Sequence, residues 1–159
     1  MSVAFTREED HEAGAADLPD RPISPHPNLV TRRGMADLEA ALEAARAAYA
    51  AALGGDISTD RTAMARATRD LRYYSARRAS AQLVEADPQA GVVVFGHPVT
   101  VEGEDGTRRT WTIVGEDEAD PRKGLISYVS PLAQALLGKP SGEEVEVAGR
   151  ELLIVSIGA

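Results

Sequence analysis

A run of small and apolar residues at spacings of three and four constrains this chain more than any other feature. It begins just after Thr31 and continues for about two and a half heptads, a pattern typical of a helix with one packed seam. The seam consists of Met35, Leu38, Leu42, Ala45, Tyr49 and Ala52. We expect Thr31 to cap this helix and Gly54 with Gly55 to end it, because glycine reverses the chain at little steric cost.

A second helix is predicted after the segment 56–60, whose sequence DISTD offers several capping residues. Its seam is poorer and consists of Ile57, Met64, Ala67, Leu71, Tyr74 and Ala81. Arg78 falls on a seam position, where it could extend its charge to solvent, pair with Glu39 or Glu43, or bind nucleic acid. The short loop forces the helices to run antiparallel, so residues 31–87 are predicted to form a coiled-coil hairpin that ends at Pro88.

Residues 1–30 form a proline-rich acidic tail that we expect to be extended. Four prolines fall between positions 19 and 27, and each one fixes φ and lacks an N–H donor. Two interpretations stay open. The tail is either a disordered linker or a strap that packs along the following domain, with Ile23 as its anchor.

The remainder of the chain, residues 91–159, changes to the alternating pattern of strands. Strand candidates flank the Asp105-Gly106 pair, a strong hairpin signal, and others follow at 126–129, 143–147 and 152–157. Ser130 and Pro131 start a short helix that Gly138 ends. The prediction is an α+β chain in which an antiparallel sheet curls over one short helix.

Charge and composition narrow the function classes. The chain carries 25 acidic against 17 basic residues, and only the middle segment 31–86 is net positive, which argues against an autonomous DNA-binding surface. The absence of cysteine excludes disulfides, thiolate catalysis and Cys-based zinc sites, and is compatible with a reducing compartment. No apolar stretch approaches the ~20 residues of a membrane span, and the first residues lack a secretory pattern, so we expect a cytoplasmic protein.

Several motifs stand out in the segment from 92 to 147: VFG at 94–96, IVG at 113–115, the acidic run 116–120 before Pro121, GLIS at 124–127 and SPLAQALLGK at 130–139. With these motifs the segment closely resembles the C-terminal domain of the GreA/GreB transcription elongation (transcript-cleavage) factor family. The opening LVTRRGMADLEAAL and the turn GGDIS also fit, so the resemblance covers about residues 28–159.

This resemblance implies a bacterial regulator of transcription elongation with an FKBP-like domain at 91–159 and an N-terminal coiled coil. The implied partner is RNA polymerase, which a monomer of this chain would bind at the secondary channel. The resemblance implies no sequence-specific DNA contact, any DNA binding being indirect, and no membrane. The expected partner-binding residues, some of them taken from the family's loop, are Asp117, Glu118, Asp120, Ser130, Pro131, Gln134 and Lys139.

The family's hairpin tip carries two acidic residues that help to hold a Mg2+ shared with the polymerase, since a hard cation prefers oxygen ligands. Asp56 matches the first, whereas Thr59 stands at the second and Asp60 follows it. Both aspartates could instead be helix caps. Each arm is also about ten residues shorter than in the family, a difference of roughly 15 Å.

Three function classes therefore stay open. The first is an RNA polymerase-binding elongation regulator that has no catalytic residues of its own and at most stimulates the polymerase's RNA cleavage. The alternative is a Rnk-like or channel-occluding interaction protein without cleavage activity. The third, a prolyl isomerase, is disfavoured because the sheet domain offers only Phe95, Trp111 and Tyr128 for an aromatic pocket.

Overall fold

A computed structural model describes residues 18–55 and 61–158 of the 159-residue chain. It divides into two compact units. We call them the helical unit, which holds the chain up to Pro25 together with Asp37–Ser80, and the sheet unit, which holds His26–Ala36 and Ala81–Ala159.

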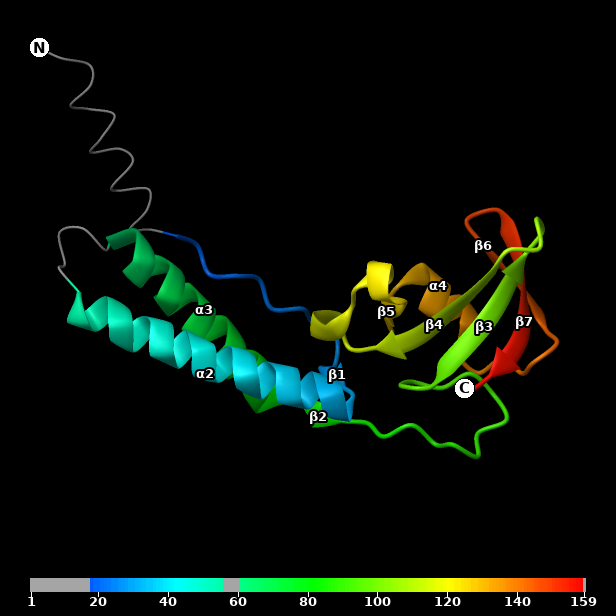
Figure 1. Ribbon diagram of the computed structural model, residues 1–159, viewed down its shortest axis with the longest axis horizontal. Coiled ribbons are helices and arrows are strands. Elements are labelled where there is room, and N and C mark those ends of the chain that lie inside the picture. Colours follow the sequence, from blue (N-terminus) through cyan, green and yellow to red (C-terminus); the bar gives the residue numbers. More distant parts are fainter. Residues whose placement is uncertain (1–17, 56–60, 159) are drawn as a thin grey trace, which may run out of the picture. The chain divides into compact units, whose positions relative to one another are not determined.

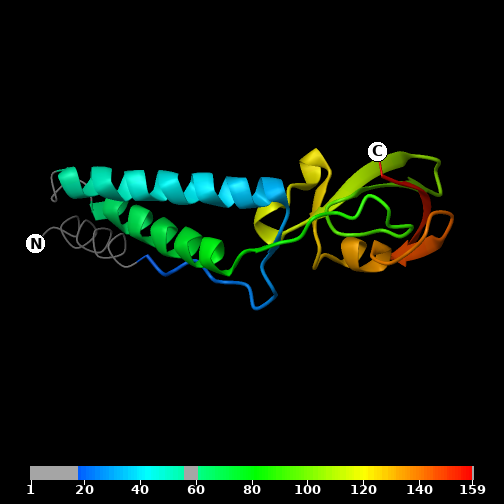
Figure 2. The ribbon, with the colours of Figure 1, turned by 90° about the horizontal axis from the view of Figure 1, so that it is seen from below.

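The helical unit is the predicted hairpin. Helix α2 (Arg32–Gly54) and helix α3 (Arg61–Ser80) lie side by side in both ribbon views (Figures 1 and 2). Four of the six predicted seam residues of α2 are buried, namely Leu38, Leu42, Ala45 and Ala52, and α3 adds Ala67. The other two, Met35 and Tyr49, are half-buried.

Helix α3 ends at Ser80, earlier than the stop predicted near Pro88. After it, β2 (Gln82–Leu83) pairs in parallel with β1 (Leu29–Val30). The N–H of Gln82 donates to the carbonyl of Asn28 at 2.8 Å, and a similar bond joins Val84 to Val30 at 2.9 Å. The backbone is satisfied by a distant segment, so the helix stops without a proline.

The sheet unit contains a five-stranded sheet in the order β5-β4-β3-β7-β6. Its strands are β3 (Pro98–Gly103), β4 (Arg108–Val114), β5 (Leu125–Ser127), β6 (Glu144–Val147) and β7 (Arg150–Ile157). The α+β class is confirmed, but a fully antiparallel sheet is wrong, because β5 pairs in parallel with β4. Parallel pairing requires the chain to run back along β4 before β5 begins. The segment 115–124 makes that return, and it is short because β5 pairs only with Thr112–Val114 at the end of β4.

The core lies between this curled sheet and helix α4 (Pro131–Leu136) (Figure 1). Ile113, Leu136 and Ile154 are fully buried there. The predicted start of α4 is confirmed, since the Ser130 hydroxyl accepts from the N–H of Ala133 at 3.3 Å. The predicted Asp105-Gly106 turn also forms, with Gly106 at a φ of 80°.

Within the described residues, no helix is long and apolar enough to cross a membrane.

Candidate functional site

The connection between β4 and β5 carries the acidic residues predicted to meet a partner. It consists of two short 3-10 helices, η1 (Glu116–Glu118) and η2 (Pro121–Lys123). Asp120 caps η2, because its carboxylate accepts from the N–H of Arg122 at 3.2 Å. Gly124 ends η2 at a φ of 74°. The loop is therefore fixed by its own local hydrogen bonds.

The three predicted acidic residues of this loop are placed differently. Asp117 is exposed on η1, and Asp120 is half-buried with its carboxylate turned to the η2 backbone. Glu118 is half-buried, and its carboxylate meets the start of α2. Sequence patterns alone did not separate these roles.

Glu118 completes the N-terminal cap of a helix that lies 87 residues away in sequence. One of its oxygens accepts from the N–H of Thr31 at 3.0 Å and from the N–H of Gly115 at 3.1 Å. The other accepts from the Thr31 hydroxyl, which itself accepts from the N–H of Gly34 at 3.0 Å. The predicted Thr31 cap is thus confirmed. In a local capping box the acid would come from the third helical residue, and here a distant residue takes that role.

Two glycines make room for this arrangement. A Cβ on Gly34 would lie 2.1 Å from the Glu118 carboxyl carbon, and a Cβ on Gly115 would lie 2.2 Å from the carbonyl oxygen of Leu29. Both distances are far below van der Waals contact. Gly34 occupies the position where a local capping box would have its acid, so its missing side chain is the one sequence signal for the remote cap.

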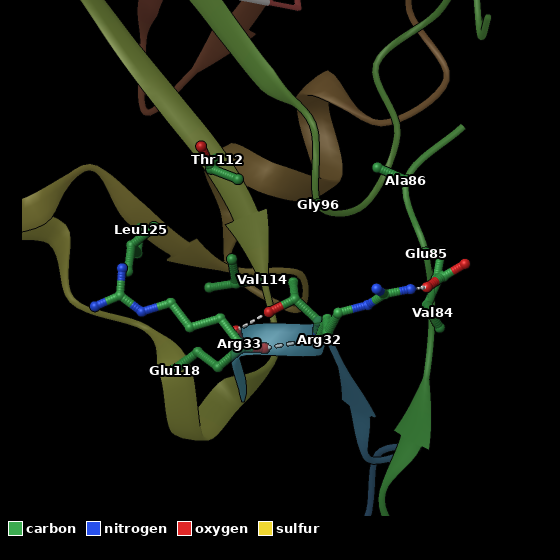
Figure 3. Close-up of a pocket in the computed structure, with 11 residues that line it drawn as sticks. Arg32, Arg33, Val84, Glu85, Ala86, Gly96, Thr112, Val114, Glu118 and Leu125 are labelled. Atoms are coloured by element: carbon green, nitrogen blue, oxygen red, sulfur yellow. Dashed lines mark hydrogen bonds and ion pairs between the residues drawn. The ribbon is translucent and has the colours of Figure 1, made fainter. Parts of the chain in front are cut away.

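A cavity of about 470 Å3 adjoins this junction within the sheet unit (Figure 3). Thr31, Gly96, Val114 and Glu118 are among its lining residues, and Arg32 pairs with Glu85 at its side. Both of its carboxylates already have cationic or N–H partners. We therefore interpret it as a structural junction and assign it no ligand.

The remaining predicted residues lie around α4. Ser130, Pro131 and Gln134 come together at its first turn, with the Gln134 amide donating to the carbonyl of Tyr128 at 2.6 Å. Lys139 lies beyond the other end of the helix, 3.5 Å from Glu143. Pro131 and Gln134 are exposed. Strand β5 joins this edge to the acidic loop, so the two groups are neighbours along the chain.

Tyr128 is a residue of this region that the sequence did not single out as a contact. Its backbone N–H donates to the carbonyl of Val114 at 2.9 Å, and its hydroxyl donates to the carbonyl of Pro27 at 2.5 Å. Its ring packs edge-on against Phe95. Tyr128 therefore fixes the turn from which α4 starts. No pattern in the neighbouring sequence predicts its hydrogen bond to a residue 101 positions away.

The predicted tip residues Asp56 and Asp60 lie outside the described residues. Elsewhere, in the ranges 18–55 and 61–158, no group of three or more His, Asp or Glu side chains is placed to hold a metal ion.

Three comparisons show which known proteins this chain is similar to. A family model described as "Transcription elongation factor, GreA/GreB, C-term" matches residues 88–157. The transcription elongation factor GreA of Chloroflexus aurantiacus is 40% identical over 138 residues, which cover 76% of this chain and 88% of that protein. The GreA of Desulfovibrio desulfuricans is 45% identical over 96 residues, and the match spans 59% of this chain but only 58% of that relative. Among solved structures, the GreA factor homolog 1 protein of Thermus thermophilus aligns with a TM-score of 0.41 at 22% identity, covering 84% of this chain and 100% of that one.

Proposed function

Because this chain belongs to the GreA/GreB family of transcription elongation factors, we propose that it regulates transcription elongation by binding RNA polymerase at the secondary channel. The observation that carries this proposal is the match to a GreA at 40% identity over 88% of that protein's length. The match spans 76% of this chain, more than the C-terminal family model alone covers.

The proposed contact surface lies on the sheet unit. It combines the acidic loop with the first turn of α4, and Lys139 lies at the far end of the helix. Its members are Asp117, Asp120, Ser130, Pro131, Gln134 and Lys139. Asp117 supports this assignment best, because it is exposed on a loop whose backbone is held rigid by local bonds. A rigid loop loses little conformational entropy when it binds.

The charge of the loop sets the expected chemistry of its counterpart. Asp117 is exposed and Asp120 is half-buried, and we expect these two carboxylates of the loop to face a partner. They fit a basic element of the polymerase. Such a contact would speed association and weaken with added salt.

Glu118 has a different proposed role, that of a positioning residue. It ties the acidic loop to the first turn of α2, so the loop is held in one conformation before a partner arrives. We leave it out of the contact surface for that reason.

The proposed activity needs no catalytic residue of this chain. Any RNA cleavage would be performed by the polymerase, and Asp56 and Asp60 would at most help to hold its Mg2+, which remains a prediction from the resemblance. Binding as a monomer and without a DNA sequence contact are likewise part of the proposal. Docking through the sheet unit does not depend on a metal ion.

Stalled elongation complexes test the function directly. Purified chain is added to polymerase halted on a template, and RNA length and the rate of nucleotide addition are followed. We expect either shortened RNA 3′ ends or a changed addition rate, and neither effect from the chain and RNA alone. An unchanged rate and unchanged RNA at saturating, micromolar concentrations of the chain would reject the proposal.

A further inference from the structure

Residues 18–25, which we call the strap, are ordered along the helical unit although they form neither helix nor strand. The strap holds three prolines, at positions 19, 22 and 25. It lies beside α3 in both views (Figures 1 and 2). Its half-buried residues are Leu18, Arg21 and Ser24, and those between them are exposed. A period of three is that of a polyproline II helix, which presents every third side chain to the same side.

Arg21 is the central contact of the strap. Its guanidinium lies 3.8 Å from the ring centre of Tyr73 and 5.2 Å from that of Tyr74. The same group is 3.5 Å from the carboxylate of Asp70. Hydrogen bonding to Tyr74 is the main cause that raises the pKa of Arg21 above its usual value. Together, these three side chains of α3 form a receptor for one guanidinium, which combines cation–π attraction with an ion pair.

A second ion pair joins Asp20 to Arg72 at 3.2 Å, with both side chains about two-thirds exposed. Ile23, which the sequence suggested as an anchor, is 49% exposed. The strap is therefore held by charged and aromatic contacts and not by a buried apolar side chain. Contacts of this kind are weak individually and sensitive to salt, so a partner can displace them.

The helix under the strap is the most positively charged part of this acidic chain. Six arginines lie on α3, and Asp70 is its one acidic residue. The strap uses that single aspartate and one of the arginines. As long as it is bound, this side of α3 is closed to another molecule.

We propose that the strap covers α3 reversibly and thereby weakens binding of the hairpin to its partner. Arg21 holds the strap on the helix, and we call this residue the latch and the strap the cover. The proposal rests on the proposed function, binding at the secondary channel of RNA polymerase, and adds that α3 of the hairpin takes part in that binding. The closed form must open before α3 can be contacted. The apparent affinity of the chain for the polymerase then equals its intrinsic affinity multiplied by the fraction of molecules in which the strap has left α3.

The latch itself is tested without the polymerase. The chain has no cysteine, so spin labels on Ile23→Cys and Ala76→Cys, both exposed, report the distance from the strap to α3. We expect one narrow distance distribution in the otherwise unchanged chain and a broad one after Arg21→Ala. Arg21→Lys keeps the charge but loses the planar stacking surface, and it should be intermediate. A narrow distribution that survives Arg21→Ala overturns the latch.

The covering role is tested by binding to core RNA polymerase. We expect Arg21→Ala, and separately a chain that lacks residues 1–25, to bind at least threefold more tightly than the full chain. Arg108→Ala removes an arginine of the sheet unit that pairs with Glu102 and serves as the matched control with unchanged affinity. Equal or weaker binding by both strap variants overturns the cover. If no protein binds at all, both the proposed function and the cover fail, and the label distances still decide whether Arg21 is a latch.

Discussion

The helical unit and the sheet unit are stabilised in different ways. The sheet unit buries one contiguous cluster in which Val99, Ile113, Leu136 and Ile154 have no exposed surface. In the described part of the helical unit, the buried apolar residues are two leucines and three alanines. Because apolar burial contributes about 25 cal/mol per Å2, alanines contribute little, and the hairpin depends more on its surface contacts.

We infer from this difference that the two units have different roles. A densely packed sheet keeps the acidic loop in one conformation, whereas a thinly packed hairpin can exchange one set of surface contacts for another. The strap on α3 is the clearest instance, since charged and aromatic groups hold it there.

Ile113→Ala is expected to have the largest effect, because it opens a cavity in the fully packed core of the sheet unit. The free energy of unfolding should fall by about 3 kcal/mol. The only tryptophan, Trp111, lies in the same core, so its fluorescence reports the unfolding of the sheet unit, while circular dichroism at 222 nm reports the helices. A loss below 1 kcal/mol would show that the core of the sheet unit is not tightly packed.

Glu118→Ala should cost about 2 kcal/mol, because it removes the acceptor for the Thr31 N–H, the Thr31 hydroxyl and the Gly115 N–H. Asp117→Ala is the matched control, an exposed neighbour whose loss should leave stability within about 0.5 kcal/mol.

The remote cap can also be replaced by a local one. Gly34→Glu places an acid at the third helical residue, where a capping box normally has it. In the Glu118→Ala background this change should recover part of the lost stability. Alone it should destabilise, because the side chain would collide with Glu118. Additive losses in the double variant would contradict the capping role.

The ion pair between Arg78 and Glu39, 3.0 Å apart, is expected to contribute about 0.5 kcal/mol or less. A double-mutant cycle with Arg78→Ala and Glu39→Ala isolates that contribution. Its coupling should shrink as salt is added, whereas the cost of Ile113→Ala should not. A coupling energy between Arg78 and Glu39 that does not change with salt would contradict the view that the helical unit depends on salt-sensitive surface contacts and the sheet unit does not.

The smallest effect is expected at Asp105, in the turn between β3 and β4. Hydrogen bonds from the backbone and hydroxyl of Thr107 lower the pKa of Asp105 below its usual value. The pKa of Asp105 is lower in the folded state than in the unfolded state. The carboxylate therefore stabilises the fold at any pH above its ordinary pKa of about 3.9, and this stabilisation is lost as the pH falls through the lowered pKa. The stability difference between the unchanged chain and Asp105→Asn should therefore be present at pH 7 and vanish in strong acid. A difference that grows toward low pH would have the wrong sign.

The local signals in the sequence predicted most of the elements. Thr31, the Asp105-Gly106 pair and the Ser130-Pro131 start each act through the backbone of nearby residues, and all three form as expected. The parallel pairing of β5 was missed, because strand direction depends on where a distant segment returns.

Contacts across long stretches of chain were missed for the same reason. Glu118 was expected to meet a partner, and its bonds to Thr31 span 87 residues. The sequence leaves open whether the tail is a disordered linker or a strap, and for a strap it indicates Ile23 as the anchor. Instead Arg21 finds Tyr73 and Tyr74 some 50 positions away, and no periodicity within the strap could reveal that pair of rings.

Binding of the full chain to core RNA polymerase is the property on which the proposed function depends. The unchanged chain is compared with Asp117→Arg, which reverses charge on the proposed contact surface, and with Glu144→Arg, an exposed charge reversal on β6. We predict binding at micromolar concentrations or below, weakened at least tenfold by Asp117→Arg and unchanged by Glu144→Arg. No binding by the unchanged chain, or equal affinity of all three, would contradict binding to the polymerase through the acidic loop.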